Sequence, residues 1–327
     1  MNCIKPIMLK SGLLVPCGQC ELCQSASRTE KSVLVQLHCL SYERMPLFLG
    51  LTYNDSHLVY GRCGYSTLHR PHLSEFIKRY KRNYSLTCER FTYVACGEYG
   101  DTYQRPHYHA IWFGDDKLHD LWLKDVHFAE DFLTDEWQHG FVDVNEAQWS
   151  GIHYVTKYCL KDGQDVPQGS VKPFFVSSNG IGIAWLKSTE AALIRRKLRY
   201  LVTHADELYS NIYLGDLNWN DSRERINYIE QAIEQLRYYM PDFRVKLPSG
   251  QSAYLPRKLR RKLVGSFEHP LDNPMWMYQT LQELLETEKY LQLHGEYDCT
   301  HDVSIAQQNR LNHINVIRQR ISKRKHS

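Results

Sequence analysis

Two histidines separated by one residue, His107 and His109, lie in the segment RPHYHAIWFG. On a β-strand, side chains alternate between the two faces, so both imidazoles would point the same way, about 6–7 Å apart. They could share one divalent ion, and Glu98 is the nearest acidic candidate for a third ligand. Such a set leaves coordination positions open for substrate oxygens, as Lewis-acid chemistry requires. An isolated His-x-His pair, however, more often only forms hydrogen bonds at a sheet edge.

A second group lies in HYVTKYCLK, where Tyr154, Lys157, Tyr158 and Lys161 would fill one arc of a helix. A phenol with a pKa of about 10 is a slow nucleophile at neutral pH. Neighbouring cations and a metal-polarised phosphate would favour the phenolate and its attack. The simpler interpretation is an amphipathic helix with Tyr and Lys at its surface. The two groups together are more informative, because each supplies what the other's chemistry lacks.

Three cysteines, Cys17, Cys20 and Cys23, follow the pattern C-x2-C-x2-C. They could hold a structural Zn²⁺ with Cys3 or Cys39 as the fourth sulfur ligand. The alternative is free thiols near a helix start, and the sequence leaves both open. Ten cysteines in 327 residues are too few for a disulfide scaffold, so we expect a reducing cytoplasm.

The scaffold that positions these groups follows from the spacing of apolar residues and from turn signals. A short connection, DTYQRP, joins the last strand before it to the first strand after it as a hairpin. Helices are predicted over 24–44, 72–83 and 149–163, strands over 46–53, 91–100, 107–114 and 140–145, and a glycine-rich loop over 173–182. This order predicts an α+β fold, ferredoxin-like or RRM-like, in which an antiparallel sheet has helices packed on one face.

We expect three parts: a Cys-rich segment and helix (1–45), a domain that carries both chemical groups (46–190), and a mostly helical basic region (191–327). With 43% hydrophobic and 24% charged residues, the chain should be soluble and globular. It shows neither a signal peptide nor an apolar run of about 20 residues, so we expect no membrane partner. The net charge of +3 hides clusters of basic residues, each of which is either a solvated face or a nucleic-acid patch.

The two chemical motifs, HYH followed by Y-x-x-K-Y, resemble those of the HUH endonucleases of the two-tyrosine class, which start rolling-circle replication. FLGLTYN (48–54) resembles their first motif, with Gly50 where threonine is usual. In this order, CGQCELC, HLSEFIKRYKR, GFVDV and PFFVSSNGIG are similar to the replication-associated proteins (VP4-type) of small single-stranded DNA phages, the gokushovirus-like Microviridae. The resemblance covers about residues 17 to 185.

The resemblance implies metal ligands at His107 and His109, with Glu98 the third, and Mg²⁺ or Mn²⁺ as the ion. It implies that Tyr154 and Tyr158 are the nucleophiles, with the following cations beside them or on the DNA: Lys157, Arg105 and Lys161. One tyrosine would nick the viral origin in single-stranded DNA, leaving a 5′-phosphotyrosine bond and a 3′-OH for a host polymerase. The second would rejoin the ends and release a circle.

A host helicase is a further expected partner, although no residue supports it, and the setting is the cytoplasm of a bacterial host. Two other function classes stay open. One is a non-catalytic nucleic-acid-binding protein with an RRM-like sheet, in which the tyrosines only stack on bases. The other is an HUH transposase or plasmid relaxase, for which a single tyrosine would be essential.

Overall fold

The computed structural model divides into two compact units. The sheet unit contains Ser25–Leu186 and Arg244–Pro256, and the helical unit contains Met1–Gln24, Lys187–Phe243 and Arg257–Ser327. The residues that the structure describes are 3–9, 14–84, 91–158, 166, 168–204, 221–264 and 274–294.

The sheet unit is built around five antiparallel strands in the order β6-β3-β5-β4-β7. The strands are β3 (Leu47–Tyr53), β4 (Thr92–Tyr99), β5 (Pro106–Phe113), β6 (Gly140–Glu146) and β7 (Phe174–Ser177). The predicted α+β class and antiparallel sheet are confirmed. β7 forms inside the segment expected to be a glycine-rich loop, and it pairs with β4 at one edge of the sheet.

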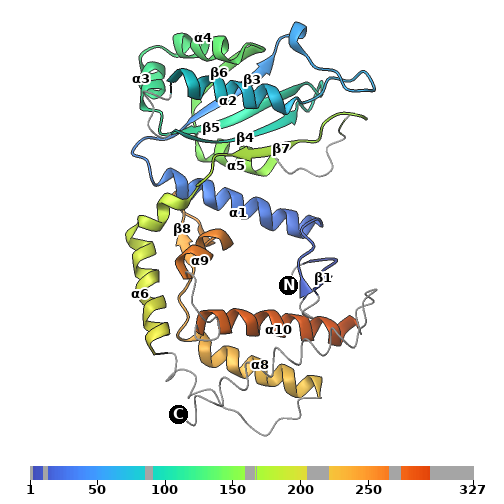
Figure 1. Ribbon diagram of the computed structural model, residues 1–327, viewed down its shortest axis with the longest axis vertical. Coiled ribbons are helices and arrows are strands. Elements are labelled where there is room, and N and C mark those ends of the chain that lie inside the picture. The colour runs from blue at the N-terminus through green and yellow to red at the C-terminus, as the bar shows by residue number, and fades with distance from the viewer. Residues whose placement is uncertain are drawn as a thin grey trace. The chain divides into compact units, whose positions relative to one another are not determined.

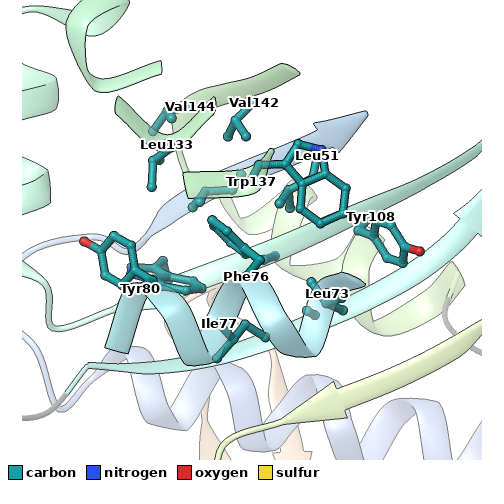
Figure 2. Close-up of a cluster of buried hydrophobic side chains, with 14 of the residues drawn as sticks. Leu51, Leu73, Phe76, Ile77, Tyr80, Tyr108, Leu133, Trp137, Val142 and Val144 are labelled. Carbon is teal, nitrogen blue, oxygen red and sulfur yellow. The ribbon is translucent and has the colours of Figure 1, made fainter. Parts of the chain in front are cut away.

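One face of the sheet is covered by α2 (Arg70–Tyr84), α3 (Asp116–Lys124) and α4 (Val126–Trp137) (Figure 1). Figure 2 shows the core beneath them, where Phe76 and Tyr80 of α2 and Trp137 of α4 pack toward Leu51 and Tyr108 of the sheet. All five side chains are at most 2% exposed. Burial of each large apolar side chain contributes about 1.5–3 kcal/mol, so this layer fixes the sheet from one side.

The opposite face is covered by α1 (Glu21–Cys39) and α5 (Trp149–Tyr158), so the expectation of helices on one face only was wrong. The reason lies in β5, which presents Ile111 and Phe113 on this second face while Trp112 points into the first. Apolar side chains on both faces have to be covered on both. Toward the other end of β5 the second face carries His107 and His109 instead.

The helical unit contains α6 (Thr189–Thr203), α8 (Ser222–Arg237), α9 (Arg257–Val264) and α10 (Pro274–His294), and the hairpin β1 (Ile7–Met8) and β2 (Leu14–Val15). Helices α8 and α10 lie side by side (Figure 1), joined by a 2.5 Å ion pair between Lys289 and Glu230. The predicted helical C-terminal region is thereby confirmed.

Three smaller elements complete the described chain. The hairpin β8 (Arg244–Lys246) and β9 (Ser252–Tyr254) belongs to the sheet unit, and the short 3-10 helices are η1 (Asp55–His57) and η2 (Ile183–Lys187). Across the described ranges, every helix is too short or too polar to cross a bilayer.

Candidate metal centre and its tyrosine

A carboxylate and two imidazoles converge on the second face of the sheet. Glu98 of β4 pairs directly with His107 of β5, and His109 points to the same face two residues on. The Oε1 atom of Glu98 lies 3.1 Å from Nε2 of His107 and 3.2 Å from Nε2 of His109. The ligand atoms of the three residues all lie within 4.8 Å of one another. The structure therefore brings the three predicted ligands together.

The hydrogen bonds around this triad suit a cation. Nδ1 of His107 donates to the carbonyl oxygen of Arg105 at 3.0 Å, which leaves the Nε2 lone pair of the neutral ring facing Glu98. A lone pair facing a carboxylate is repulsive unless a proton or a metal ion lies between them, and metal-binding histidines commonly donate their other N–H in this way. Within the described chain, Oε2 of Glu98 and Nδ1 of His109 are buried without a hydrogen-bond partner.

The charge of Glu98 is held despite its burial, with only 2% of the residue exposed. Burial alone would raise the pKa of this carboxyl, but hydrogen bonds from His107, His109 and Tyr154 outweigh it and lower the pKa to about 2. For His107, burial lowers the pKa, yet the contact with Glu98 raises it further, so the net shift is upward. A buried anion between two imidazoles is a donor set for a divalent ion.

Tyr154 lies beside this triad because α5 packs along the same face. Ile152 and Val155, on the sheet side of α5, are fully buried. The Tyr154 hydroxyl donates a 2.5 Å hydrogen bond to Oε1 of Glu98, and its ring stands edge-on to His109 with centroids 5.3 Å apart. The predicted nucleophile and the predicted ligands thus share one site.

Three other predicted site residues fall outside what can be described. Lys157 and Tyr158 belong to the backbone of α5, but their side chains lie outside the described residues, as does the whole of Lys161. Arg105 is described, and its guanidinium is engaged: it donates to Asp55 at 2.7 Å and to the carbonyl of Tyr53 at 2.7 Å. DNA binding by Arg105 stays a prediction.

Two side chains that the sequence did not single out lie on the same face. Phe141 and Asp143 of β6 stand in the cross-strand rows of His107 and His109, linked through Thr52 and Gly50 of β3. Phe141 is 65% exposed, and Asp143 is exposed as well. The missing signal was the register, since directly opposed residues of an antiparallel sheet share a face.

The Asp143 carboxylate lies over Gly50, where any other residue would place its Cβ. Gly50 is the position at which the first motif departs from threonine, so this departure makes room for a second acid on the side of β3 that faces His109.

The three cysteines of the C-x2-C-x2-C pattern meet Cys3, and not Cys39. The sulfur atoms of Cys3, Cys17, Cys20 and Cys23 all lie within 4.8 Å of one another. Cys39 is buried in the core between α1 and the sheet. Of the two fourth ligands that the sequence allowed, the structure selects Cys3.

An α+β fold with a Glu-His-His candidate metal centre and a tyrosine in contact with it is thus defined, and comparison gives its class. Residues 46–163, which contain the whole site, match the model of the family described as replication-associated protein of the ORF2 type. The resemblance to phage replication-associated proteins that the motifs indicated is confirmed.

Individual relatives are phage proteins. The chain is 31% identical over 156 residues to the replication-associated protein VP4 of Bdellovibrio phage phiMH2K, covering 45% of this chain and 48% of that protein. It is 29% identical over 153 residues to the replication-associated protein ORF2 of Spiroplasma virus 4, with 45% and 48% covered. For the replication-associated protein ORF4 of Chlamydia phage 1 it is 29% over 157 residues, with 45% and 38% covered. The chain spans less than half the length of these curated relatives, and no solved structure matches it.

Proposed function

We propose that this protein initiates phage DNA replication by nicking and rejoining single-stranded DNA through tyrosine. The observation that carries the proposal is the contact between the Tyr154 hydroxyl and Glu98, the acid shared by His107 and His109. It joins a nucleophile to a candidate metal centre. The family match over residues 46–163 and the similarity to phage replication-associated proteins support the same function.

In this proposal Glu98, His107 and His109 hold Mg²⁺ or Mn²⁺, which polarises the scissile phosphate when bound. The chain's own residues do the rest. The carbonyl of Arg105 orients His107, so that Nε2 rather than Nδ1 faces the ion site. The sheet holds all three ligands on two hydrogen-bonded strands, a rigid support that limits their motion.

Tyr154 is proposed to attack the phosphorus. A phenolate oxygen–phosphorus bond forms, the bond from phosphorus to the 3′ oxygen breaks, and the 3′ oxygen leaves and gains a proton. Because Oε1 of Glu98 accepts the hydrogen bond from the Tyr154 hydroxyl, it is the nearest acceptor for the proton that the phenol loses. The product is a 5′-phosphotyrosine and a free 3′-OH.

The rejoining step assigns the second phenol to Tyr158, one helical turn along α5 from Tyr154, with Lys157 and Lys161 as cations near the phosphate. These roles, like the boundaries at residues 45 and 190, stay predictions. A bacterial cytoplasm, a host polymerase and a host helicase belong to the same proposal.

The bases are proposed to lie on the open part of the sheet near β6. Phe141, 65% exposed and in the cross-strand row of His107, offers an uncharged ring for stacking. Tyr103, 88% exposed in the connection between β4 and β5, offers another beside a hollow that His107 lines. An exposed aromatic ring on an open sheet also suits a non-catalytic nucleic-acid binder, so the decisive experiment has to detect covalent chemistry.

The experiment incubates the full chain and Mn²⁺ with 3′-labelled single-stranded oligonucleotides that tile the genome encoding it. A denaturation-resistant adduct is expected on one oligonucleotide, and it should be lost in the Tyr154→Phe/Tyr158→Phe double variant. Tyr60→Phe, an exposed tyrosine of the same unit, is the matched control.

The outcomes separate the function classes. If no oligonucleotide forms an adduct with the wild type, the nicking proposal fails and the RRM-like binder remains. If Tyr154→Phe alone removes both nicking and rejoining while Tyr158→Phe changes neither, the relaxase or transposase class replaces the two-tyrosine class.

A further inference from the structure

A second potential metal site lies in the helical unit, with no residue in common with the first. Cys3 Sγ lies 3.9 Å from Cys20 Sγ, and Cys17 Sγ lies 4.0 Å from Cys23 Sγ, with all four sulfurs within 4.8 Å of one another. We propose that these four cysteines bind one Zn²⁺ as a structural tetrathiolate site.

The size of the sulfur cluster agrees with a tetrahedral ion. With Zn–S bonds of about 2.3 Å, the edges of a ZnS4 tetrahedron are about 3.8 Å long. The two printed sulfur separations are within a few tenths of an ångström of that value. Disulfides need sulfurs about 2.05 Å apart, and all four residues are free thiols. Four thiols gathered this closely are therefore arranged around a common centre and not bonded in pairs.

The backbone around the cluster donates to sulfur. The N–H groups of Gln19 and Cys20 point to Cys17 Sγ at 3.4 and 3.3 Å, and the N–H of Cys17 points to Cys3 Sγ at 3.2 Å. Gly18, at φ +74° with open space around it, permits the tight turn between Cys17 and Cys20. Amide donors aimed at sulfur stabilise thiolates, the form that binds metal.

The start of α1 adds to the same effect. Cys20 immediately precedes this helix and Cys23 lies in its first turn, where the helix dipole favours negative charge. Four soft thiolates in tetrahedral array select Zn²⁺ or iron over the hard ions Mg²⁺ and Mn²⁺. The Glu98 centre, with one oxygen and two nitrogen donors, has a different preference, so the two sites need not compete for one ion.

The site would hold together a part of the chain that has little else to fix it. The strands β1 and β2 have two residues each, and a hairpin of that size is not stable alone. Leu14 of β2 is 2% exposed, and its N–H donates to Oγ1 of Thr287 in α10 at 3.2 Å. Because Cys3 and Cys17 flank the hairpin and Cys20 and Cys23 flank the helix start, one ion would tie the packed hairpin to α1.

The test uses the full chain, purified under reducing conditions, and needs no DNA. We expect one tightly bound zinc per chain by elemental analysis. Replacement by Co²⁺ should give sulfur-to-cobalt charge-transfer absorption in the near ultraviolet, which the sulfur-free Glu98 centre cannot produce. A His107→Ala/His109→Ala variant should keep this absorption, so failure of the nicking proposal leaves the result intact.

Single Cys→Ser variants at each of the four positions should lose the zinc and the cobalt absorption. Cys63→Ser, at an exposed cysteine of the sheet unit, is the matched control and should keep both. If the serine variants do not fold, alkylation of the wild type gives the answer. The four cysteines should react only after a strong chelator is added, whereas Cys63 reacts in both conditions.

Three results would overturn the proposal: a reduced wild type without zinc, equal alkylation of the four cysteines with and without chelator, or iron in place of zinc.

Discussion

Two glycines next to the candidate site, Gly50 and Gly140, predict opposite outcomes for the same substitution. A Cβ added to Gly50 would collide with Oδ1 of Asp143 and lie 2.8 Å from its Cγ. A Cβ added to Gly140 would collide with the carbonyl oxygen of Thr52 and lie 2.5 Å from the backbone nitrogen of Asn54. The first obstacle is the end of an exposed side chain, which can rotate away; the second is backbone, which cannot.

The expected free energies differ accordingly. Gly50→Ala should change the free energy of unfolding by less than about 1 kcal/mol, because alanine in a strand recovers about 0.5–1 kcal/mol of backbone entropy. Gly140→Ala overpacks the β3–β6 pair, which costs about 1–3 kcal/mol. For a unit of this size each kcal/mol shifts Tm by about 2–4 °C, so Gly140→Ala should lower Tm by roughly 2–12 °C.

Thermal unfolding followed by circular dichroism measures both variants, and Mn²⁺ titration measures a second effect. Since Gly50→Ala has to move the Asp143 carboxylate from its place in the row of His109, we expect weaker Mn²⁺ binding with an unchanged Tm. Equal loss of Tm in the two variants would refute the packing argument. Unchanged Mn²⁺ affinity in Gly50→Ala would remove Asp143 from the metal centre.

Three further predictions concern single residues. Glu98→Gln keeps the shape of a ligand but removes its charge, so Mn²⁺ binding followed by electron paramagnetic resonance should weaken by at least the roughly 10- to 100-fold known for outer-shell partners; exposed Glu75→Gln is the control, and equal affinities would contradict Glu98 as a ligand. Phe141→Ala should weaken single-stranded DNA binding roughly 5- to 150-fold in fluorescence anisotropy, because stacking contributes about 1–3 kcal/mol per base, whereas Phe141→Trp should bind as the wild type does. Burial lowers the pKa of His38 to about 4 from 6.5, so its neutral form stabilises the fold fully above pH 6.5, and about 3 kcal/mol is lost as the pH falls to about 4; denaturant midpoints should therefore drop less on acidification in His38→Gln, and an identical drop would show that His38 does not contribute.

The predictable part of the site is the part that local pattern fixes. Alternation along one strand placed His107 and His109 on the same face, and a short connection set Glu98 opposite His107. Phe141 and Asp143 depend on the register between β3 and β6, whose paired residues are about ninety positions apart in sequence. Nothing local fixes such a pairing, so neither residue could be placed.

Other failures had signals that were present but unused. Asp115 and Asp125 lie in an acidic stretch of the sequence, yet each side chain caps a helix, the first accepting from the N–H of Leu118 and the second from that of Phe128. Cys39 could have been excluded as a fourth ligand on length alone. It lies sixteen residues after Cys23 in one predicted helix, about 24 Å along the axis at 1.5 Å per residue.

The exposed part of the sheet near β6 has a consequence for how DNA affinity responds to salt. Thr52, Phe141, Asp143 and Asn145 are exposed there, and none of these four carries a positive charge. Contacts with phosphates release bound counterions and weaken steeply as salt rises, whereas contacts between rings and bases release none. Replacing Phe141 should therefore lower the affinity by the same factor at every ionic strength, while replacing a phosphate-binding lysine should change the slope of affinity against salt.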